Sequence, residues 1–129
     1  MSISMIGIDH SKASVDIRAK FSFTKKRAIE AMKKLKEEHG ILGCIILSTC
    51  NRMEVWVSTQ DDEEISLYDF LCKEKEVEKD EYQDYFMKRE NEEAVRHLFY
   101  LTSGLKSQIL AEDQIITQVK DALSMAREQ

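Results

Sequence analysis

Two adjoining segments near the middle of the chain constrain the fold most. Residues 41–48 (ILGCIILS) form an almost unbroken apolar run, which is typical of a strand at the centre of a sheet. Residues 54–59 then alternate, with Val55 and Val57 on one face and Glu54, Trp56 and Ser58 on the other. We therefore expect two strands here, with residues 50–53 forming the turn between them or its rim.

The first part of the chain predicts one further strand and one helix. Residues 2–9 have the pattern of a strand, and Thr24 can cap a helix that runs to about residue 39. Gly40 provides the stop that ends this helix. Its expected buried face consists of Ala28, Ile29, Met32 and Leu35.

The second half of the chain is expected to be mostly helical. Residues 61–62 can cap a short helix, and the charge run over residues 73–81 favours a solvated segment. A fourth strand is expected within residues 82–88. Asn91 caps the next helix and Gly104 ends it. The apolar positions of the short helix are Ile65, Tyr68, Leu71 and Cys72. Those of the helix that begins at Asn91 are Ala94, Val95, Leu98 and Leu101. A final amphipathic helix is expected to carry Ile115, Ile116, Val119, Ala122, Leu123 and Ala126.

This order of elements predicts an α+β fold. A small, mostly antiparallel sheet with flanking helices, extended by extra C-terminal helices, matches the ferredoxin-like arrangement of split βαβ units. The length of 129 residues favours a single domain that occupies residues 1–129.

Composition and charge exclude several classes of protein. No apolar stretch is long enough for a membrane span, and the N-terminus lacks the pattern of a signal peptide, so we expect a cytoplasmic protein. The three cysteines do not form a disulfide scaffold, and their spacing does not predict a zinc or other metal site. The net charge of −5 excludes a generic polyanion binder. The basic helix over residues 25–36 can meet phosphates, although a solvated face is the favoured interpretation.

The densest reactive cluster is the segment that follows the apolar run. Cys50 lies where that strand ends, and Arg52 nearby favours a thiolate, the nucleophilic form of cysteine. Thr49 and Asn51 can donate hydrogen bonds to an oxyanion. On composition alone, a small buried cysteine is the simpler reading of Cys50. His97 is similarly open to two interpretations, a half-buried structural histidine or an acid–base partner for Cys50.

Three segments resemble the glutamyl-tRNA reductase family, in the same order and with matching spacing. They are residues 7–13 (GIDHSKA), residues 47–54 (LSTCNRME), and the stretch that contains residues 94–99 (AVRHLF), 103–105 (SGL) and 112–115 (EDQI). The resemblance covers essentially the whole chain and implies the N-terminal catalytic domain of that enzyme.

The resemblance implies an NADPH-dependent reduction of glutamyl-tRNA to glutamate 1-semialdehyde, the first step of tetrapyrrole (porphyrin and heme) biosynthesis from glutamate. Cys50 would attack the ester and hold a thioester, and His97 matches a histidine important for activity. The implied substrate-binding residues are Thr49, Asn51, Arg52, Ser107, Glu112, Asp113, Gln114 and Gln118.

The resemblance also implies partners outside this chain. The family continues into an NADPH-binding domain and a dimerisation domain, so the expectation is that this chain lacks both and that the full-length enzyme is a homodimer. No glycine-rich phosphate loop occurs in the sequence. The alternative reading is a non-catalytic binding or regulatory module with the same fold.

Overall fold

The structure, a computed structural model, describes residues 2–38, 40–60 and 65–104. Its elements, in order, are β1 (Ser2–Asp9), α1 (Val15–Phe21), α2 (Lys25–Lys36), β2 (Ile41–Ser48), β3 (Arg52–Thr59), α3 (Leu67–Lys75), α4 (Lys79–Tyr82), a 3-10 turn (Gln83–Tyr85), β4 (Met87–Glu90) and α5 (Asn91–Gly104). None of the described helices is long and apolar enough to cross a membrane.

The four described strands form one antiparallel sheet in the order β2-β3-β1-β4. This order, with helices between β1 and β2 and between β3 and β4, is the ferredoxin-like topology, so the predicted α+β fold class is confirmed. In the register of the sheet, Glu54 of β3 lies between Leu47 of β2 and Gly7 of β1. The end of β1 also lies close to the predicted reactive turn, because Asp9 pairs with Arg52 at the start of β3.

One expectation about the sheet is wrong, because β2 is an edge strand and not a central one. Its apolar run reflects burial on both faces. Ile45, Ile46 and Leu47 are all buried, although they alternate in direction along the strand. Apolar residues at successive positions indicate that both faces of a strand are buried. They do not indicate whether the strand has one neighbouring strand or two.

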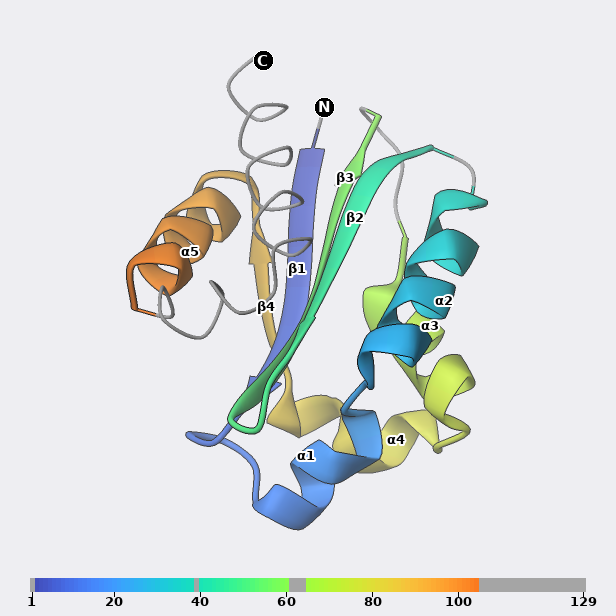
Figure 1. The fold of residues 1–129 in the computed structure, drawn as a ribbon, viewed down its shortest axis with the longest axis vertical. Helices are drawn as coiled ribbons and strands as arrows, with labels where there is room; N and C mark the ends of the chain where they lie inside the picture. The colour runs from blue at the N-terminus through green and yellow to red at the C-terminus, as the bar shows by residue number, and fades with distance from the viewer. Residues whose placement is uncertain (1, 39, 61–64, 105–129) are drawn as a thin grey trace.

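Helices cover both faces of the sheet (Figure 1). On one face, α1, α2 and α3 pack on Ile6, Ile8, Ile46 and Val55, which belong to the main hydrophobic core. On the other face, α5 packs against β1 and β4. The alternation predicted for β3 is confirmed, but both of its faces are buried, including Glu54 and Trp56.

Helix boundaries depart from the sequence pattern in three places. The seven-residue helix α1, capped by the side chain of Ser14, is too short to give a periodic signal. Helix α2 has the predicted cap, since the Thr24 hydroxyl accepts the backbone N–H of Arg27, but its helical residues end at Lys36. Ala31 replaces Ile29 and Met32 on its fully buried face, because the smaller side chain lies closest to the sheet.

The N-cap of α3 is Ser66, whose hydroxyl accepts the N–H of Asp69, and not residues 61–62. The charge run over residues 73–81 contains the end of α3 and most of α4, and its side chains are largely exposed as expected. The fourth strand exists, but a 3-10 turn delays its start to Met87.

Helix α5 begins at Asn91 as predicted, and the Asn91 side-chain oxygen accepts the backbone N–H of Ile3 on β1. Ala94 is fully buried on the expected apolar stripe. The side chains of Leu98 and Leu101 and the whole predicted final helix lie outside the described residues.

Candidate active site

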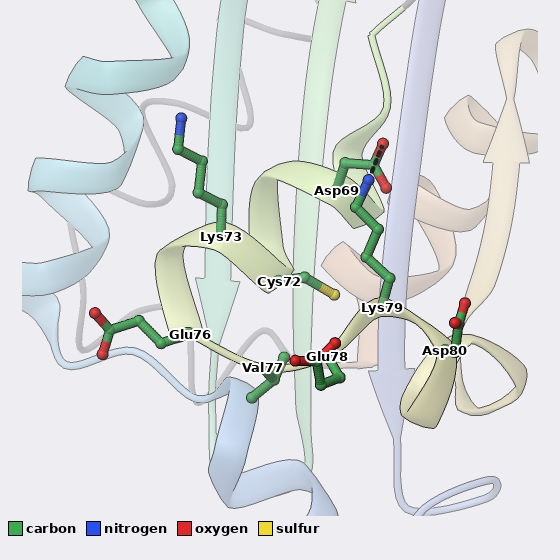
Figure 2. A pocket seen from close by; sticks show the side chains of 8 residues that line it. All are labelled: Asp69, Cys72, Lys73, Glu76, Val77, Glu78, Lys79 and Asp80. Atoms are coloured by element: carbon green, nitrogen blue, oxygen red, sulfur yellow. Dashed lines mark ion pairs between the residues drawn. The ribbon is translucent and has the colours of Figure 1, made fainter.

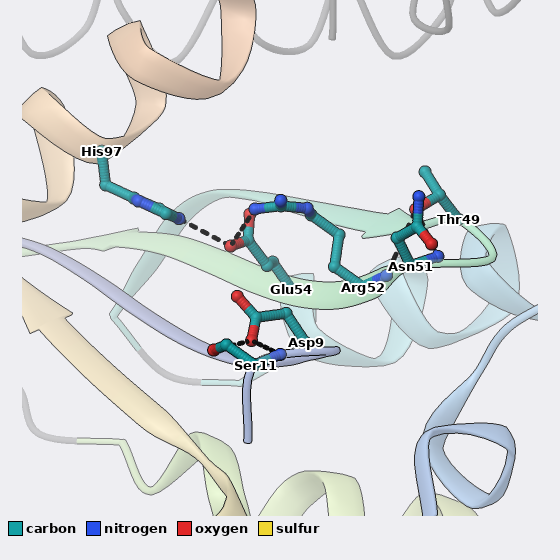
Figure 3. A network of polar contacts seen from close by, with 7 residues as sticks. All are labelled: Asp9, Ser11, Thr49, Asn51, Arg52, Glu54 and His97. Carbon is teal, nitrogen blue, oxygen red and sulfur yellow. Dashed lines mark hydrogen bonds and ion pairs between the residues drawn. The ribbon is translucent and has the colours of Figure 1, made fainter. Parts of the chain in front are cut away.

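The predicted turn between β2 and β3 is organised by Thr49. Its N–H donates to the carbonyl oxygen of Arg52 at 2.8 Å, and its Oγ1 accepts the N–H groups of Asn51 at 3.2 Å and of Arg52 at 3.3 Å. Threonine hydroxyls commonly stabilise tight turns in this way. Figure 3 shows the side chains of Thr49 and Asn51 at this turn. The hydroxyl proton of Thr49 is not used by these contacts and can still be donated to a ligand.

Cys50 lies in this turn, and it is the exposed one of the three cysteines. Cys72 is buried at 2% exposure. Burial raises the pKa of Cys44 to about 11, and its thiol donates a hydrogen bond to the carbonyl oxygen of Met32. Since a thiolate that solvent can reach is the reactive form, accessibility alone already favours Cys50 as the nucleophile. The buried-cysteine alternative for Cys50 is therefore wrong, whereas Cys72 lies in the hydrophobic core, as its apolar helix position predicts.

The end of β1 lies beside this turn. The His10 N–H donates to the carbonyl oxygen of Asn51 at 3.2 Å. Asp9 Oδ1 accepts both the N–H and the hydroxyl of Ser11, at 2.9 Å and 2.5 Å (Figure 3). Burial raises the pKa of Asp9, but these two hydrogen bonds and the charge of Arg52 outweigh burial and hold the pKa below its usual value. The end of β1 thus carries a negative charge near Arg52.

The structure adds Glu54 to the predicted site residues. This carboxylate is 1% exposed, and its Oε2 lies 2.7 Å from Nε2 of His97 and 3.9 Å from Nη1 of Arg52 (Figure 3). A buried carboxylate requires such partners, because an unpaired charge in the interior is costly. The available sequence signal was the single acidic position in the alternating β3 pattern, on the same face as Trp56.

His97, on α5, completes a row of charged groups that consists of Arg52, Glu54 and His97. Its side chain is 10% exposed, and its ring stacks on Trp56 with the ring centres 5.8 Å apart and the planes 11° from parallel. The structure therefore brings His97 together with Arg52 through Glu54. His97 thus packs on the face of β3 that carries Glu54 and Trp56, where it has a specific polar partner.

Gly7 makes room for the buried carboxylate. A Cβ atom at Gly7 would lie 2.9 Å from Glu54 Cγ and 3.1 Å from Met5 Cε, which is too close without a shift. Gly7 faces Glu54 directly in the β1–β3 register. A glycine at this position therefore allows the backbone of β1 to approach the Glu54 side chain.

Within the part of the chain that the structure describes, two polar atoms of Arg52 and Glu54 have no hydrogen-bond partner. They are Oε1 of Glu54 and Nε of Arg52, one acceptor and one donor. Buried polar groups are normally paired, so neighbouring unpaired atoms of opposite hydrogen-bonding character are the kind of feature that a polar ligand satisfies. The arrangement thus combines an accessible thiol with a row of charged groups that can orient a polar substrate.

Five predicted binding residues lie outside the described residues, so their positions are not part of this geometry. They are Ser107, Glu112, Asp113, Gln114 and Gln118. Among the described residues, no group of three or more His, Cys, Asp or Glu side chains is arranged to hold a metal ion.

A separate hollow of about 620 Å³ lies along α3 and α4 (Figure 2). Charged side chains from both helices and the turn between them line it, and Cys72 is the cysteine at its wall. Its lining is Asp69, Cys72, Lys73, Glu76, Val77, Glu78, Lys79 and Asp80. Neither Cys50 nor the Glu54 row contributes to it, so this hollow is distinct from the candidate active site.

The fold and this site define a class: a ferredoxin-like α+β domain that presents an exposed cysteine at a hairpin turn beside a buried row of charges. Comparison with known proteins makes the class specific. A family model described as the N-terminal domain of glutamyl-tRNAGlu reductase matches residues 6–129. The chain belongs to this family, so the resemblance seen in the sequence is confirmed.

Individual relatives agree with the family. The chain is 41% identical over 128 residues to a glutamyl-tRNA reductase of Acetivibrio thermocellus, covering 99% of this chain and 39% of that protein. It is 39% identical to one of Alkaliphilus oremlandii, covering 99% of this chain and 38% of that protein. A solved structure of glutamyl-tRNA reductase from Methanopyrus kandleri superposes with a TM-score of 0.61 at 32% identity, covering 98% of this chain and 28% of that chain. The chain thus spans well under half the length of these relatives.

Proposed function

We propose that this chain performs the acyl-transfer half of glutamyl-tRNA reduction, with Cys50 as the nucleophile. The observation that carries the proposal is the exposure of Cys50 in the Thr49-organised turn, within a chain of this family. The complete reaction would convert glutamyl-tRNA to glutamate 1-semialdehyde, the first step of tetrapyrrole biosynthesis.

The proposed step is a transesterification. The Cys50 thiolate attacks the ester carbonyl carbon, a carbon–sulfur bond forms, and the carbon–oxygen bond to the terminal ribose breaks. The departing ribose oxygen takes up a proton, the RNA leaves, and the glutamyl group remains as a thioester. Thr49 and Asn51, on either side of Cys50, can donate hydrogen bonds to the carbonyl oxygen as it gains negative charge.

Arg52 is the proposed partner of the substrate's side-chain carboxylate. A guanidinium can bind a carboxylate through two parallel hydrogen bonds, and Nε of Arg52 has no hydrogen-bond partner among the described residues. Glu54 lies 3.9 Å from Nη1, so it orients the guanidinium and leaves other N–H groups for the substrate. His97, held by Glu54, is the proposed second polar group of the site.

The hydride donor in this family, NADPH, has no evident place among the described residues. Dinucleotides bind where a glycine-rich turn exposes backbone N–H groups to the pyrophosphate. Here the space at Gly7 is filled by Glu54, and the hollow along α3 and α4 is lined by four carboxylates against two lysines, which is unfavourable for a phosphate. The described residues therefore do not fit NADPH.

The direct test is to trap the thioester. The chain is incubated with glutamyl-tRNA, quenched in acid and mapped by peptide mass spectrometry. We expect one glutamyl group on the peptide that contains Cys50, none in a Cys50→Ala variant, and an unchanged yield in the matched Cys44→Ala variant. A glutamyl adduct that persists in Cys50→Ala, or its absence from the parent chain, would contradict the proposal.

A further inference from the structure

The first turn of α2 carries an unusual charge pattern. Lys25, Lys26 and Arg27 occupy it, all three are exposed, and the turn contains no acidic residue. The N-terminal end of a helix is the positive end of its dipole, where acidic side chains are favourable and basic ones are not. Sequences tend to break such local rules at functional sites, so this pattern calls for a functional reason. We call these three residues the basic turn.

The basic turn lies at the same end of the sheet as the turn that contains Cys50. The N–H of Phe23, just before the helix cap, donates to the hydroxyl of Ser48 at 3.0 Å. Ser48 is the last residue of β2 and precedes the turn that contains Cys50. Figure 1 shows the start of α2 and the β2–β3 turn at the same end of the sheet. A ligand that extends from Cys50 past Ser48 would therefore approach the start of α2.

A fourth cation reinforces this end of the helix. Lys75, from the last turn of α3, donates to the carbonyl oxygen of Ser22 at 2.6 Å, and its ammonium lies 3.8 Å from the centre of the Phe23 ring. Burial lowers the pKa of Lys75, and the charge of Arg27 lowers it further. The Lys75 contacts thus hold a cation close to Arg27 despite their mutual repulsion. A polyanion that bound here would relieve that repulsion.

We propose that the basic turn, with Lys75, docks backbone phosphates of the RNA that carries the glutamyl ester and so places its 3′ end at Cys50. The inference rests on the proposed function, which makes an RNA the leaving group. Because the chain carries a net charge of −5, it can hold a polyanion only through a local cluster of cations. The basic turn is such a cluster, and it lies at the same end of the sheet as the nucleophile.

The helix itself provides a matched control. A Lys26→Gln/Arg27→Gln variant removes two positive charges from the basic turn, and a Lys33→Gln/Lys36→Gln variant removes two from the last turn of α2. All four side chains are exposed, so neither change disturbs the core. The dipole predicts opposite effects on folding, with a higher Tm for the first variant and a lower Tm for the second. Weaker RNA binding by a more stable protein cannot be attributed to unfolding.

The first readout is the affinity of each variant of this chain for uncharged tRNAGlu, measured by fluorescence anisotropy at several salt concentrations. We expect the Lys26→Gln/Arg27→Gln variant to bind roughly 10- to 30-fold more weakly at about 0.1 M salt. Its slope of log affinity against log salt should be shallower by about 1.4, because two phosphate contacts are lost. The control variant should stay within about twofold of the parent. Equal losses in both variants, or an unchanged slope, would overturn the inference.

The second readout separates this inference from the proposed function. Acylation of Cys50 is followed with glutamyl-tRNA and with the glutamyl ester of adenosine, which has the reacting bond but no phosphate. We expect the Lys26→Gln/Arg27→Gln variant to lose rate with glutamyl-tRNA only. If both substrates react equally well with parent and variant, the docking surface is wrong and the nucleophile stands. If neither substrate acylates the parent, the proposed function fails, and the binding measurement still decides the docking surface.

Discussion

Nε2 of His97 lies 2.7 Å from Oε2 of Glu54, a contact that joins helix α5 to the centre of the sheet across 43 positions of sequence. Glu54 is nearly inaccessible to solvent and also faces Arg52. One carboxylate therefore contacts two cationic or polar side chains of the candidate site. We expect Glu54 to act as a positioning residue, through Arg52 and His97.

The Glu54–His97 contact should be measurable as an energetic coupling. Glu54→Gln and His97→Gln, made singly and together, should each destabilise the fold, and the double variant should show a coupling of about 1–3 kcal/mol because buried partners are not independent. Urea unfolding of the four proteins gives this number. Strictly additive losses would show that the 2.7 Å contact contributes nothing specific to stability.

Gly7→Ala should disturb the site from the opposite strand. The new methyl group would lie 2.9 Å from Glu54 Cγ, so we expect a loss of about 1–3 kcal/mol of stability, the usual cost of overpacking. Glu54→Asp, which shortens the side chain, should recover part of that loss in the Gly7→Ala background. Thermal and urea unfolding test both steps. A Gly7→Ala protein as stable as the parent would contradict the close packing.

Cys50 should be the first thiol to react with iodoacetamide near neutral pH. It is exposed, whereas Cys72 is buried and the pKa of Cys44 is raised to about 11 by burial. Peptide mass mapping after short labelling times measures the order. In denaturant the three rates should become similar, since their differences arise from the fold. Labelling of Cys44 or Cys72 ahead of Cys50 in the folded chain would remove the case for an accessible nucleophile.

Arg52→Lys should impair acyl transfer although it conserves the charge. A lysine ammonium cannot form the two parallel hydrogen bonds by which a guanidinium binds a carboxylate. We expect a loss of about 1.5–3 kcal/mol in transition-state stabilisation, the range for hydrogen bonds to charged groups. Single-turnover acylation of Cys50 by glutamyl-tRNA measures it. A glutaminyl ester, which lacks the side-chain carboxylate, should show a much smaller difference between parent and variant.

Asp9→Asn should reduce stability near neutral pH but not in acid. The pKa of Asp9 is lowered in the folded state from 3.8, so its charged form stabilises the fold above that value and the contribution is lost as pH falls through the folded pKa. We expect a loss of about 0.5–1 kcal/mol at pH 7, modest because the loop is partly exposed to solvent. The difference in the free energy of unfolding between the parent and the variant should shrink as the pH falls below 3.8. The exposed control Asp84→Asn should show no comparable difference at pH 7.

The sequence by itself determined the local elements and the reactive turn. Strand β2 has the predicted bounds, Thr24 caps α2, and Cys50 lies in the turn between β2 and β3, because these features depend on side-chain periodicity and on contacts within a few residues. The ordered motifs around Cys50 and His97 also indicated the family. Short features could not be predicted from the sequence: the seven-residue helix α1 was not expected, and the N-cap of α3 is Ser66 instead of residues 61–62.

Only the tertiary structure decided how these elements meet. The apolar pattern of β2 could not show that it lies at the sheet edge, because a strand that is buried on both faces carries apolar residues whether it lies at the centre or at the edge of a sheet. Nor could the pattern of β3 show that Glu54 is buried between Arg52 and His97, opposite a glycine that leaves it room. A charged residue in an alternating strand ordinarily faces solvent. Here it faces α5, and the pairing of distant charges makes that burial possible.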